Sequence, residues 1–514
     1  MNNSNTPSVN SSSALNAARR ARELDELSSG DTVDLLVIGG GITGVGVALD
    51  AASRGLNVVL AEKHDLAFGT SRWSSKLAHG GLRYLATGNV GIARESAVER
   101  GILMTRTAPH LVRALPQLVP VLESTTLFSK SLVRAGFLAG DFLRASARTS
   151  STVLPRSRTV RADRVVELAP AVRRQGLRGG LLAFDGQLID DSRLVVAIAR
   201  TAALHGAKIL TRTGAYNVTG TSATLRDELT GSEMAIKARA VVNAAGVWSG
   251  EIDPEITLRP SRGTHLVLPA EKLGNPTAAL TVPIPGETNR FVFALPAQLG
   301  RVYLGLTDEA APGPVPDVPT ASDQEIDFLL ATVNTALEVP LERSDILGTF
   351  AGLRPLLDTG DGSTADLSRN HAILRSGTDL VSVVGGKLTT YRKMAEDAVD
   401  AAVKVSGLEA GPCRTKTLPL VGAAAPEALR KVAAPPTLLA RYGTEAALLA
   451  AAAPDMLAPI AEGLDVSRAE LEFAATHEGA LDVDDILDRR TRIGLVPADR
   501  ERASSVAASA FEMG

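Results

Sequence analysis

Residues 33–62 contain the pattern that most restricts what this chain can fold into. An apolar run at 33–38 stops at three successive glycines, and small residues with helical spacing follow directly. A second apolar run, 57–61, ends at Glu62. Strand, tight turn, helix and strand in this order predict the opening of a doubly wound, largely parallel α/β sheet.

The glycines of this turn have the spacing G-x-G-x-x-G, at Gly39, Gly41 and Gly44. The first permits the tight turn, the second lets backbone approach a pyrophosphate, and the third lets the helix pack closely on the strand. Glu62 follows roughly 20 residues later, where an acid accepts hydrogen bonds from an adenosine ribose. The segment therefore predicts a dinucleotide site, without choosing between NAD and FAD.

Two later strands end in small residues and favour FAD. VVNAAG at 241–246 precedes Trp248, and LVSVVGG at 380–386 runs into Lys387 at the start of a helix. Glycine turns so far apart in sequence suit a long, extended dinucleotide that both parts of the chain contact.

The length of 514 residues requires more than one core, because single cores stop growing at roughly 250–300 residues. We expect a flexible tail at 1–30, an FAD-binding and substrate-binding region at 31–410, and a C-terminal helical domain at 411–514. The substrate layer falls mainly at about 110–190 and 255–350, where period-2 runs indicate antiparallel strands in the later part.

Bulk composition excludes several classes of protein. The formal net charge of -3 gives no electrostatic case for nucleic acid. Cys413 is the only cysteine, so an intrachain disulfide is excluded, and no Cys and His spacing resembles a metal site. A single cysteine fits a reducing interior, so we expect a cytoplasmic protein. No apolar run reaches the roughly 20 residues of a spanning helix, so we expect no segment that crosses a membrane.

Eight further segments resemble the FAD-dependent glycerol-3-phosphate dehydrogenase family, in the family's own order from about residue 33 to about 496. They are GTSRWSSKLAHGGLRYL (69–85), DGQLIDDSRL (185–194), VVNAAGVWS (241–249), RGTHLVLP (262–269), GLTD (305–308), AGLRPL (351–356), GGKLTTYRKMAE (385–396) and DDILDRRTRIGL (484–495). The chain departs from the family at Trp73, where members usually carry a small residue, and in its polar tail before Val33.

The resemblance implies a Rossmann-like FAD-binding domain of the glutathione-reductase/D-amino-acid-oxidase type, an antiparallel-sheet substrate domain and a C-terminal α-helical domain. It also implies which residues bind the cofactor, in addition to the three glycines and Glu62. These are Thr70, Ser71, Ser75, Lys76, Leu77, Trp248, Gly386, Lys387, Leu388 and Thr389.

Cations at matching positions suit a phosphorylated substrate. Arg83 and Arg354 each follow a glycine-containing turn, and guanidinium groups bind a compact dianion through two parallel hydrogen bonds. Lys387 serves either the phosphate or the flavin, and Arg369 is either a substrate ligand or structural. Two hydroxyl groups, those of Tyr84 and Thr390, are further candidate donors.

Oxidation of an alcohol also needs a group that takes the hydroxyl proton. His79 and His265 lie inside matching motifs and are the candidates, and Arg354 is a candidate for stabilising the developing alkoxide. Asp190 and Asp191 are adjacent, so in a strand they point to opposite faces and are interpreted as structural.

The resemblance implies oxidation of glycerol 3-phosphate to dihydroxyacetone phosphate, with FAD passing electrons to a quinone. Three alternatives stay open: an oxidase that uses oxygen, an amino-acid oxidase, and a flavin-binding protein without turnover. Peripheral contact with the inner face of the cell membrane and a homodimer are also open.

Overall fold

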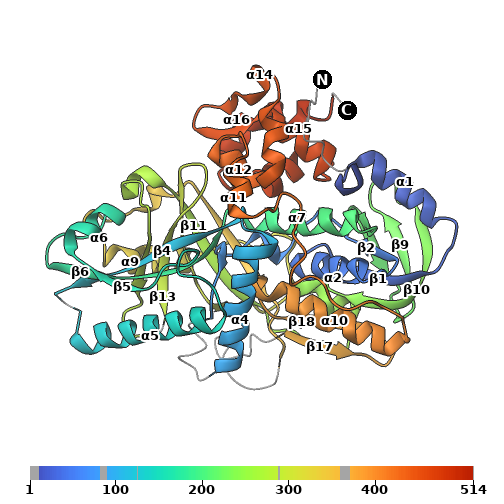
Figure 1. Ribbon diagram of the computed structural model, residues 1–514, viewed down its shortest axis with the longest axis horizontal. Coiled ribbons are helices and arrows are strands. Elements are labelled where there is room, and N and C mark those ends of the chain that lie inside the picture. Colours follow the sequence, from blue (N-terminus) through green and yellow to red (C-terminus); the bar gives the residue numbers. More distant parts are fainter. Residues whose placement is uncertain (1–10, 82–88, 124, 288–289, 359–370, 513–514) are drawn as a thin grey trace.

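The structure is a computed structural model that describes residues 11–81, 89–123, 125–287, 290–358 and 371–512. Two sheets lie side by side, and a helical C-terminal domain lies against both (Figure 1). No helix in these described ranges is both long and apolar enough to span a membrane.

The first sheet has the strand order β17-β18-β10-β1-β2-β7. Neighbouring strands from β18 to β7 are parallel, and β17 is an antiparallel edge strand. The bounds are β1 Val33–Ile38, β2 Val58–Ala61, β7 Lys208–Leu210, β10 Glu233–Asn243, β17 His371–Arg375 and β18 Val381–Gly385, with β8 Thr213–Tyr216 and β9 Ser222–Asp227 extending β10 as an antiparallel ribbon.

Both faces of this sheet are covered, because alternate side chains of β1 enter two cores. Leu35 and Val37 pack with the helices α2 (Ile42–Ser53), α7 (Asp191–Leu204) and α10 (Tyr391–Ser406). Leu36 and Ile38 pack on the other side with residues of the β8–β9 ribbon. The predicted doubly wound start of the fold is confirmed.

The second sheet has the order β15-β11-β14-β13-β12-β4-β6-β3, with β16 on β11 and β5 on β6. Most pairs are antiparallel, as expected for the substrate layer. The bounds are β3 Leu77–Ala78, β4 Val112–Leu122, β5 Arg158–Val160, β6 Leu177–Leu188, β11 Ser261–Pro269, β12 Ala279–Pro283, β13 Phe291–Pro296, β14 Arg301–Gly305, β15 Glu309–Ala310 and β16 Gly348–Arg354.

Helices α6 (Ala162–Leu168) and α9 (Asp323–Asn334) contribute to the core of this sheet. The helices α4 (Val90–Ile102) and α5 (Leu127–Ser146) lie lower in the view of Figure 1, with α5 below the second sheet.

The C-terminal domain is helical, as expected. Its elements are α11 Pro426–Leu429, α12 Pro436–Tyr442, α13 Ala446–Ala450, α14 Pro454–Leu457, α15 Arg468–His477 and α16 Pro497–Ser509, with the hairpin β19 Pro459–Ala461 and β20 Leu464–Ser467. Most of its buried residues form clusters of their own, and Leu495 and Val496 pack against Val267 and Phe350 of the second sheet.

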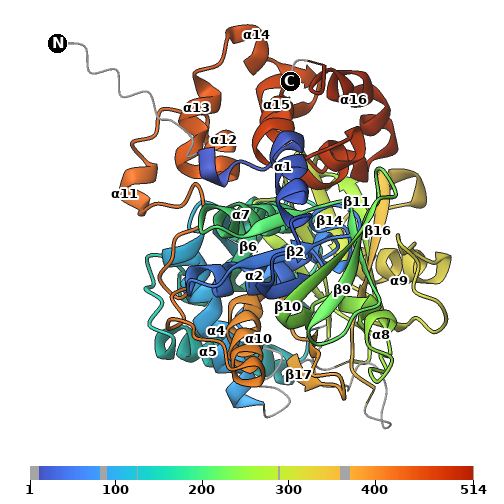
Figure 2. The ribbon, with the colours of Figure 1, turned by 90° about the vertical axis from the view of Figure 1, so that its right-hand side faces the viewer.

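The expected flexible tail at 1–30 is wrong for the part that the structure describes. Helix α1 (Ala17–Leu27) lies next to the C-terminal domain (Figure 2). Arg20, Glu23 and Leu27 are buried, and the Arg20 Nε donates to the carbonyl of Thr211 at 2.7 Å. The many polar side chains of this segment predicted a free tail, although two of them, Arg20 and Glu23, face inward. Residues 1–10 lie outside the described residues.

Candidate active site

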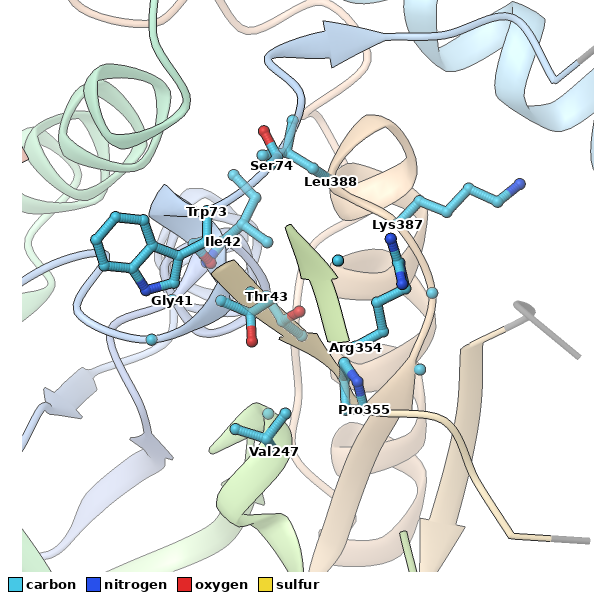
Figure 3. Close-up of a pocket in the computed structure, with 18 of the residues that line it drawn as sticks. Gly41, Ile42, Thr43, Trp73, Ser74, Val247, Arg354, Pro355, Lys387 and Leu388 are labelled. Carbon is cyan, nitrogen blue, oxygen red and sulfur yellow. The ribbon is translucent and has the colours of Figure 1, made fainter. Parts of the chain in front are cut away.

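A cavity of about 1570 Å³ is lined by residues of both sheets (Figure 3). The turn after β1, the end of β2 and the turns after β10 and β18 contribute from the first sheet. Strands β11, β13 and β16 contribute from the second. This is where a doubly wound sheet binds its ligand, beyond the carboxyl ends of its strands.

The glycine turn gives the cavity a surface of bare backbone. A Cβ on Gly39 would lie 2.7 Å from the Ala244 carbonyl oxygen, and one on Gly41 would lie 3.1 Å from Ser71 Oγ. Gly44 lies outside the cavity lining, and a Cβ there would come within 1.9 Å of the Gly39 carbonyl oxygen. Its task is therefore the close packing of α2 on the turn.

Glu62 lies at the end of β2 and lines the cavity. Its carboxylate accepts hydrogen bonds from the backbone N–H of Gly40 at 2.5 Å and of His64 at 2.8 Å. Burial outweighs these two donors and raises the pKa of Glu62 above its usual 4.5. Each carboxylate oxygen has a second lone pair, so the group can still accept from a ribose hydroxyl.

Sequence reasoning missed several lining residues around Glu62. Lys63, His64 and Phe68 follow it, and the His64 and Phe68 rings stack with centroids 3.9 Å apart. Residues 215–218, at the end of β8, face the same part of the cavity. Their position depends on how the β8–β9 ribbon folds over the sheet, and no motif in the sequence marks it.

The expected cofactor residues from 69 to 77 follow the cavity wall, except for Lys76. The lining members are Thr70, Ser71, Ser75 and Leu77, joined by Trp248, Gly386, Lys387, Leu388 and Thr389 from the later turns. The Ser71 hydroxyl accepts from the backbone N–H of Ile42 at 2.8 Å, directly at the start of α2. This loop therefore begins at the dinucleotide turn and runs along the cavity.

Arg354 ends β16 and lines the cavity. Its guanidinium donates to Ser261 Oγ at 3.0 Å, to Asp308 Oδ1 at 3.1 Å and to the Thr307 carbonyl at 3.1 Å. A Cβ on Gly263 would lie 2.3 Å from its Nη2, so this glycine makes room for the guanidinium. The group is held in a fixed place, as anion recognition requires.

Lys387 is a second cation of the lining, at the turn after β18. Figure 3 draws Arg354 and Lys387 on one side of the pocket and Trp73 on the other. The Lys387 ammonium points outward in this view and donates to Ser96 Oγ of α4 at 3.1 Å.

His79 lines the cavity just after β3. Its Nδ1 accepts a hydrogen bond from the backbone N–H of Gly81 at 3.3 Å. Asp185 of β6 lines the cavity nearby and was missed. It accepts from the Gly80 N–H at 3.1 Å and from Arg100 Nη1 at 2.7 Å. Asp185 opens the DGQLIDDSRL segment, so that segment carried a signal for it.

Three predicted site residues do not line the cavity with their side chains, and these predictions require correction. His265 is fully buried. The Lys76 ammonium donates to Asp191 Oδ2 at 2.9 Å and to the carbonyls of Arg72 and Ser74. The Thr390 hydroxyl donates to the Lys387 carbonyl at 3.3 Å inside the helix start.

Asp190 and Asp191 are structural, as predicted, but they begin helix α7 and are not in a strand. Asp190 caps α7, and Asp191 pairs with Lys76.

Arg83, Tyr84 and Arg369 lie outside the described residues. Within the described ranges, no group of three or more His, Cys, Asp or Glu side chains could hold a metal ion.

Two family models match the chain. Residues 34–392 match a model described as FAD dependent oxidoreductase, and residues 413–512 match the C-terminal domain of alpha-glycerophosphate oxidase. The bare glycine turn, the acid at the end of β2 and the long cavity fit FAD. The chain thus belongs to the FAD-dependent oxidoreductases and uses FAD as its cofactor.

Similar proteins of known name identify the family within the FAD-dependent oxidoreductases. Glycerol-3-phosphate dehydrogenase 1 of Mycobacterium tuberculosis is 66% identical over 96% of this chain and 98% of its own. The mitochondrial glycerol-3-phosphate dehydrogenase SDP6 of Arabidopsis thaliana is 35% identical over 96% and 84%. The chain is a member of the FAD-dependent glycerol-3-phosphate dehydrogenase family.

Solved structures agree with this assignment. The glycerol-3-phosphate dehydrogenase from Bacillus halodurans complexed with FAD matches with a TM-score of 0.71 and 27% identity, over 97% of this chain and 94% of that one. The L-alpha-glycerophosphate oxidase from Mycoplasma pneumoniae, with FAD bound, has a TM-score of 0.57 at 17% identity over 76% and 99%, which shows a shared fold.

Proposed function

We propose that this protein oxidises sn-glycerol 3-phosphate to dihydroxyacetone phosphate and passes the electrons to a quinone. The observation that carries the proposal is the Arg354 guanidinium. It donates hydrogen bonds to Ser261, Asp308 and Thr307 in the wall of the cavity that also contains the dinucleotide turn. The names of the relatives that match nearly the whole chain support the same substrate.

Bound FAD supplies the acceptor for a hydride from the carbon that bears the hydroxyl. The protein binds the substrate anion with Arg354, and we assign Arg83, Arg369 and Lys387 to the same phosphate on the strength of the family resemblance. An amino-acid oxidase binds a single carboxylate, which does not require several cations. Several cations assigned to one anion therefore favour a phosphate over a carboxylate.

We assign the hydroxyl proton to His79, because of the two candidate histidines only His79 lines the cavity. Arg354 also stabilises negative charge that develops on the substrate oxygen. Both groups are fixed by hydrogen bonds to the chain, so they are in place before the substrate arrives.

Addition of glycerol 3-phosphate to the purified holoprotein without oxygen tests the reaction. The flavin absorbance should bleach with the wild type, and Arg354→Ala should require a much higher substrate concentration. A spectrum that does not change at millimolar substrate would reject the reaction and leave a flavin-binding protein without turnover.

Supply of an acceptor to the reduced protein then separates two versions of the enzyme. A quinone that reoxidises the flavin faster than air does supports the dehydrogenase. Stoichiometric hydrogen peroxide in air would identify an oxidase instead.

The quinone is supported by an apolar part of the same cavity. It is lined by Leu132, Val133 and Phe137 of α5 and by Phe291 and Phe293 of β13. We assign this apolar region to the quinone, and the outer face of α5 to peripheral contact with a membrane surface.

A further inference from the structure

Ser75 and His265 form a pair at the wall of the cavity. Ser75 lines the cavity, and its hydroxyl lies 2.9 Å from Nε2 of His265 on β11. His265 itself is fully buried behind Ser75 and does not line the cavity. Any effect of His265 on a ligand in the cavity must therefore pass through the Ser75 hydroxyl.

The His265 ring is held in one orientation by two neighbouring strands. It stacks on Phe350 of β16 with ring centroids 4.6 Å apart and planes 11° from parallel. On the other strand, a Cβ on Gly305 would lie 2.3 Å from the ring, so that glycine leaves the space that the ring fills. The geometry at Ser75 is thus set by packing between strands.

The ring is neutral. Burial lowers the pKa of His265 well below its usual 6.5, and the positive charges of Lys76 and Arg354 lower it further. A neutral imidazole has one nitrogen that donates a hydrogen bond and one that accepts.

The hydrogen-bond inventory decides which nitrogen donates. Within the described residues, the buried Nδ1 of His265 has no hydrogen-bond partner. A buried N–H without a partner is rarer and costlier than an acceptor with a free lone pair. The proton of the ring therefore lies on Nε2, which donates to the Ser75 oxygen.

This arrangement leaves the proton of Ser75 for a ligand. Its hydroxyl forms a single hydrogen bond within the described residues, and in that bond it accepts. We propose that His265 is a positioning residue that turns the Ser75 hydroxyl into a hydrogen-bond donor toward the flavin ring. The inference deepens the proposed function and rests on it for the identity of the reaction.

The flavin is favoured over the substrate as the acceptor because of the loop that carries Ser75. Ser71, on the same loop, receives the N–H of Ile42 at the dinucleotide turn, and the residues between follow the cavity wall from there. A hydroxyl donor at the flavin stabilises the negative charge that the ring gains when it is reduced.

The test compares four variants of the holoprotein: Ser75→Ala, His265→Phe, His265→Gln and the double variant Ser75→Ala with His265→Phe. Phenylalanine keeps a ring that can stack on Phe350 but lacks the donor, whereas glutamine keeps an N–H. The readouts are the flavin midpoint potential without substrate, measured against reference dyes, and the rate of anaerobic flavin reduction by glycerol 3-phosphate.

Ser75→Ala should lower the rate about tenfold, as expected for a hydrogen bond to a charged group. The matching decrease in midpoint potential is about 30 mV for a two-electron couple. His265→Phe should produce the same changes, the double variant should equal Ser75→Ala alone, and His265→Gln should stay near wild type. His110→Phe is the control, because His110 is a half-buried histidine whose Nδ1 is also buried without a partner among the described residues, but it does not line the cavity.

Three results would overturn the proposal. If Ser75→Ala changes KM but leaves the midpoint potential as it is, the hydroxyl serves the substrate. If the decreases in rate and midpoint potential of the two single variants add up in the double variant, His265 does not act through Ser75 and has a structural role. Loss of an ionisation from the pH profile in His265→Gln would make His265 the base. The midpoint potential is measured without substrate, so this measurement tests the role of Ser75 and His265 even if glycerol 3-phosphate does not reduce the flavin.

Discussion

Glu62 combines a buried position with a task that needs its charge. Because burial raises its pKa, the carboxylate begins to protonate at a higher pH than a free glutamate. The ionised form is the better acceptor for a ribose hydroxyl. We therefore expect the affinity of the apoprotein for FAD to fall as the pH decreases through this raised pKa.

Glu62→Gln removes both the charge and the ionisation. Its affinity for FAD should be about tenfold weaker near neutral pH, as expected for loss of a hydrogen bond to a charged group, and should change little with pH. Titration of the apoprotein with FAD between about pH 5 and pH 8, followed by flavin fluorescence, measures both. Parallel pH profiles for the two proteins would contradict this role.

The sequence predicted the roles of residues that depend on neighbours close in sequence. It did not predict the roles of residues whose partners are distant in sequence. Gly39, Gly41 and Glu62 were predicted because turn, strand and acid lie within one short segment. Lys76 was assigned to the cofactor, but its partner Asp191 is 115 residues away. His265 was a candidate base, and only the packing of β14 and β16 around it shows that it is buried.

At the scale of elements, the sequence predicted the parallel strands of the first sheet well and the long antiparallel strands of the second sheet less well. Strands that are buried on both faces have nearly continuous apolar sequences, interrupted only by Asp34 in β1 and by Ser382 in β18. The segment at 110–190 looked irregular, although it contains the long strands β4 and β6. Three glycines in β6 and two prolines in β4 interrupt the apolar patterns, and only the pairing of the two strands with each other shows that they are regular.

Helix α5 exposes several large apolar side chains to solvent. Leu127, Leu138 and Phe142 have exposed fractions of 83%, 52% and 74%. Lys130 and Arg134 lie on the same helix and suit anionic headgroups. This face is the part of the molecule that we expect to lie on a membrane.

Leu138→Ser and Phe142→Ser should each weaken binding to anionic liposomes by about tenfold to a hundredfold, since burial of such a side chain contributes about 1.5–3 kcal/mol. Flavin reduction by a soluble donor should not change. Val339→Ser is the control, because Val339 is also 74% exposed but lies away from α5. Cosedimentation in low and high salt measures the binding, and equal binding of all variants would remove α5 as the contact.

At the scale of the whole molecule, buried ion pairs join the C-terminal domain to the FAD domain. Asp65, just after β2, pairs with Arg489 at 2.6 Å and Arg490 at 2.8 Å. Arg492 lies 3.2 Å from Asp190 and donates to the Arg72 carbonyl in the cavity loop. The sequence indicated a separate helical domain. It did not indicate these ion pairs, because the partners lie far apart along the chain, more than 400 positions for Asp65 and Arg489.

The substitution Asp65→Asn tests this connection. Burial alone would raise the pKa of Asp65, but the guanidinium groups of Arg490 and Arg489 outweigh it and hold the pKa well below its usual 3.8. The ionised carboxylate therefore stabilises the fold at neutral pH, and this contribution is lost as the pH falls below about 4. Asp65→Asn leaves the buried Arg490 guanidinium without its carboxylate, and it removes one carboxylate partner of Arg489, which keeps Asp485. This change should cost about 3–5 kcal/mol at neutral pH.

Denaturant unfolding at a series of pH values measures this effect. The difference between Asp65→Asn and wild type should be largest near neutral pH and should shrink in acid. Asp163→Asn is the control, because Asp163 pairs with Arg161 in full contact with solvent and its loss should leave the unfolding midpoint as it is. If the decrease in unfolding free energy caused by Asp65→Asn did not depend on pH, packing and not charge would connect the C-terminal domain to the flavin site.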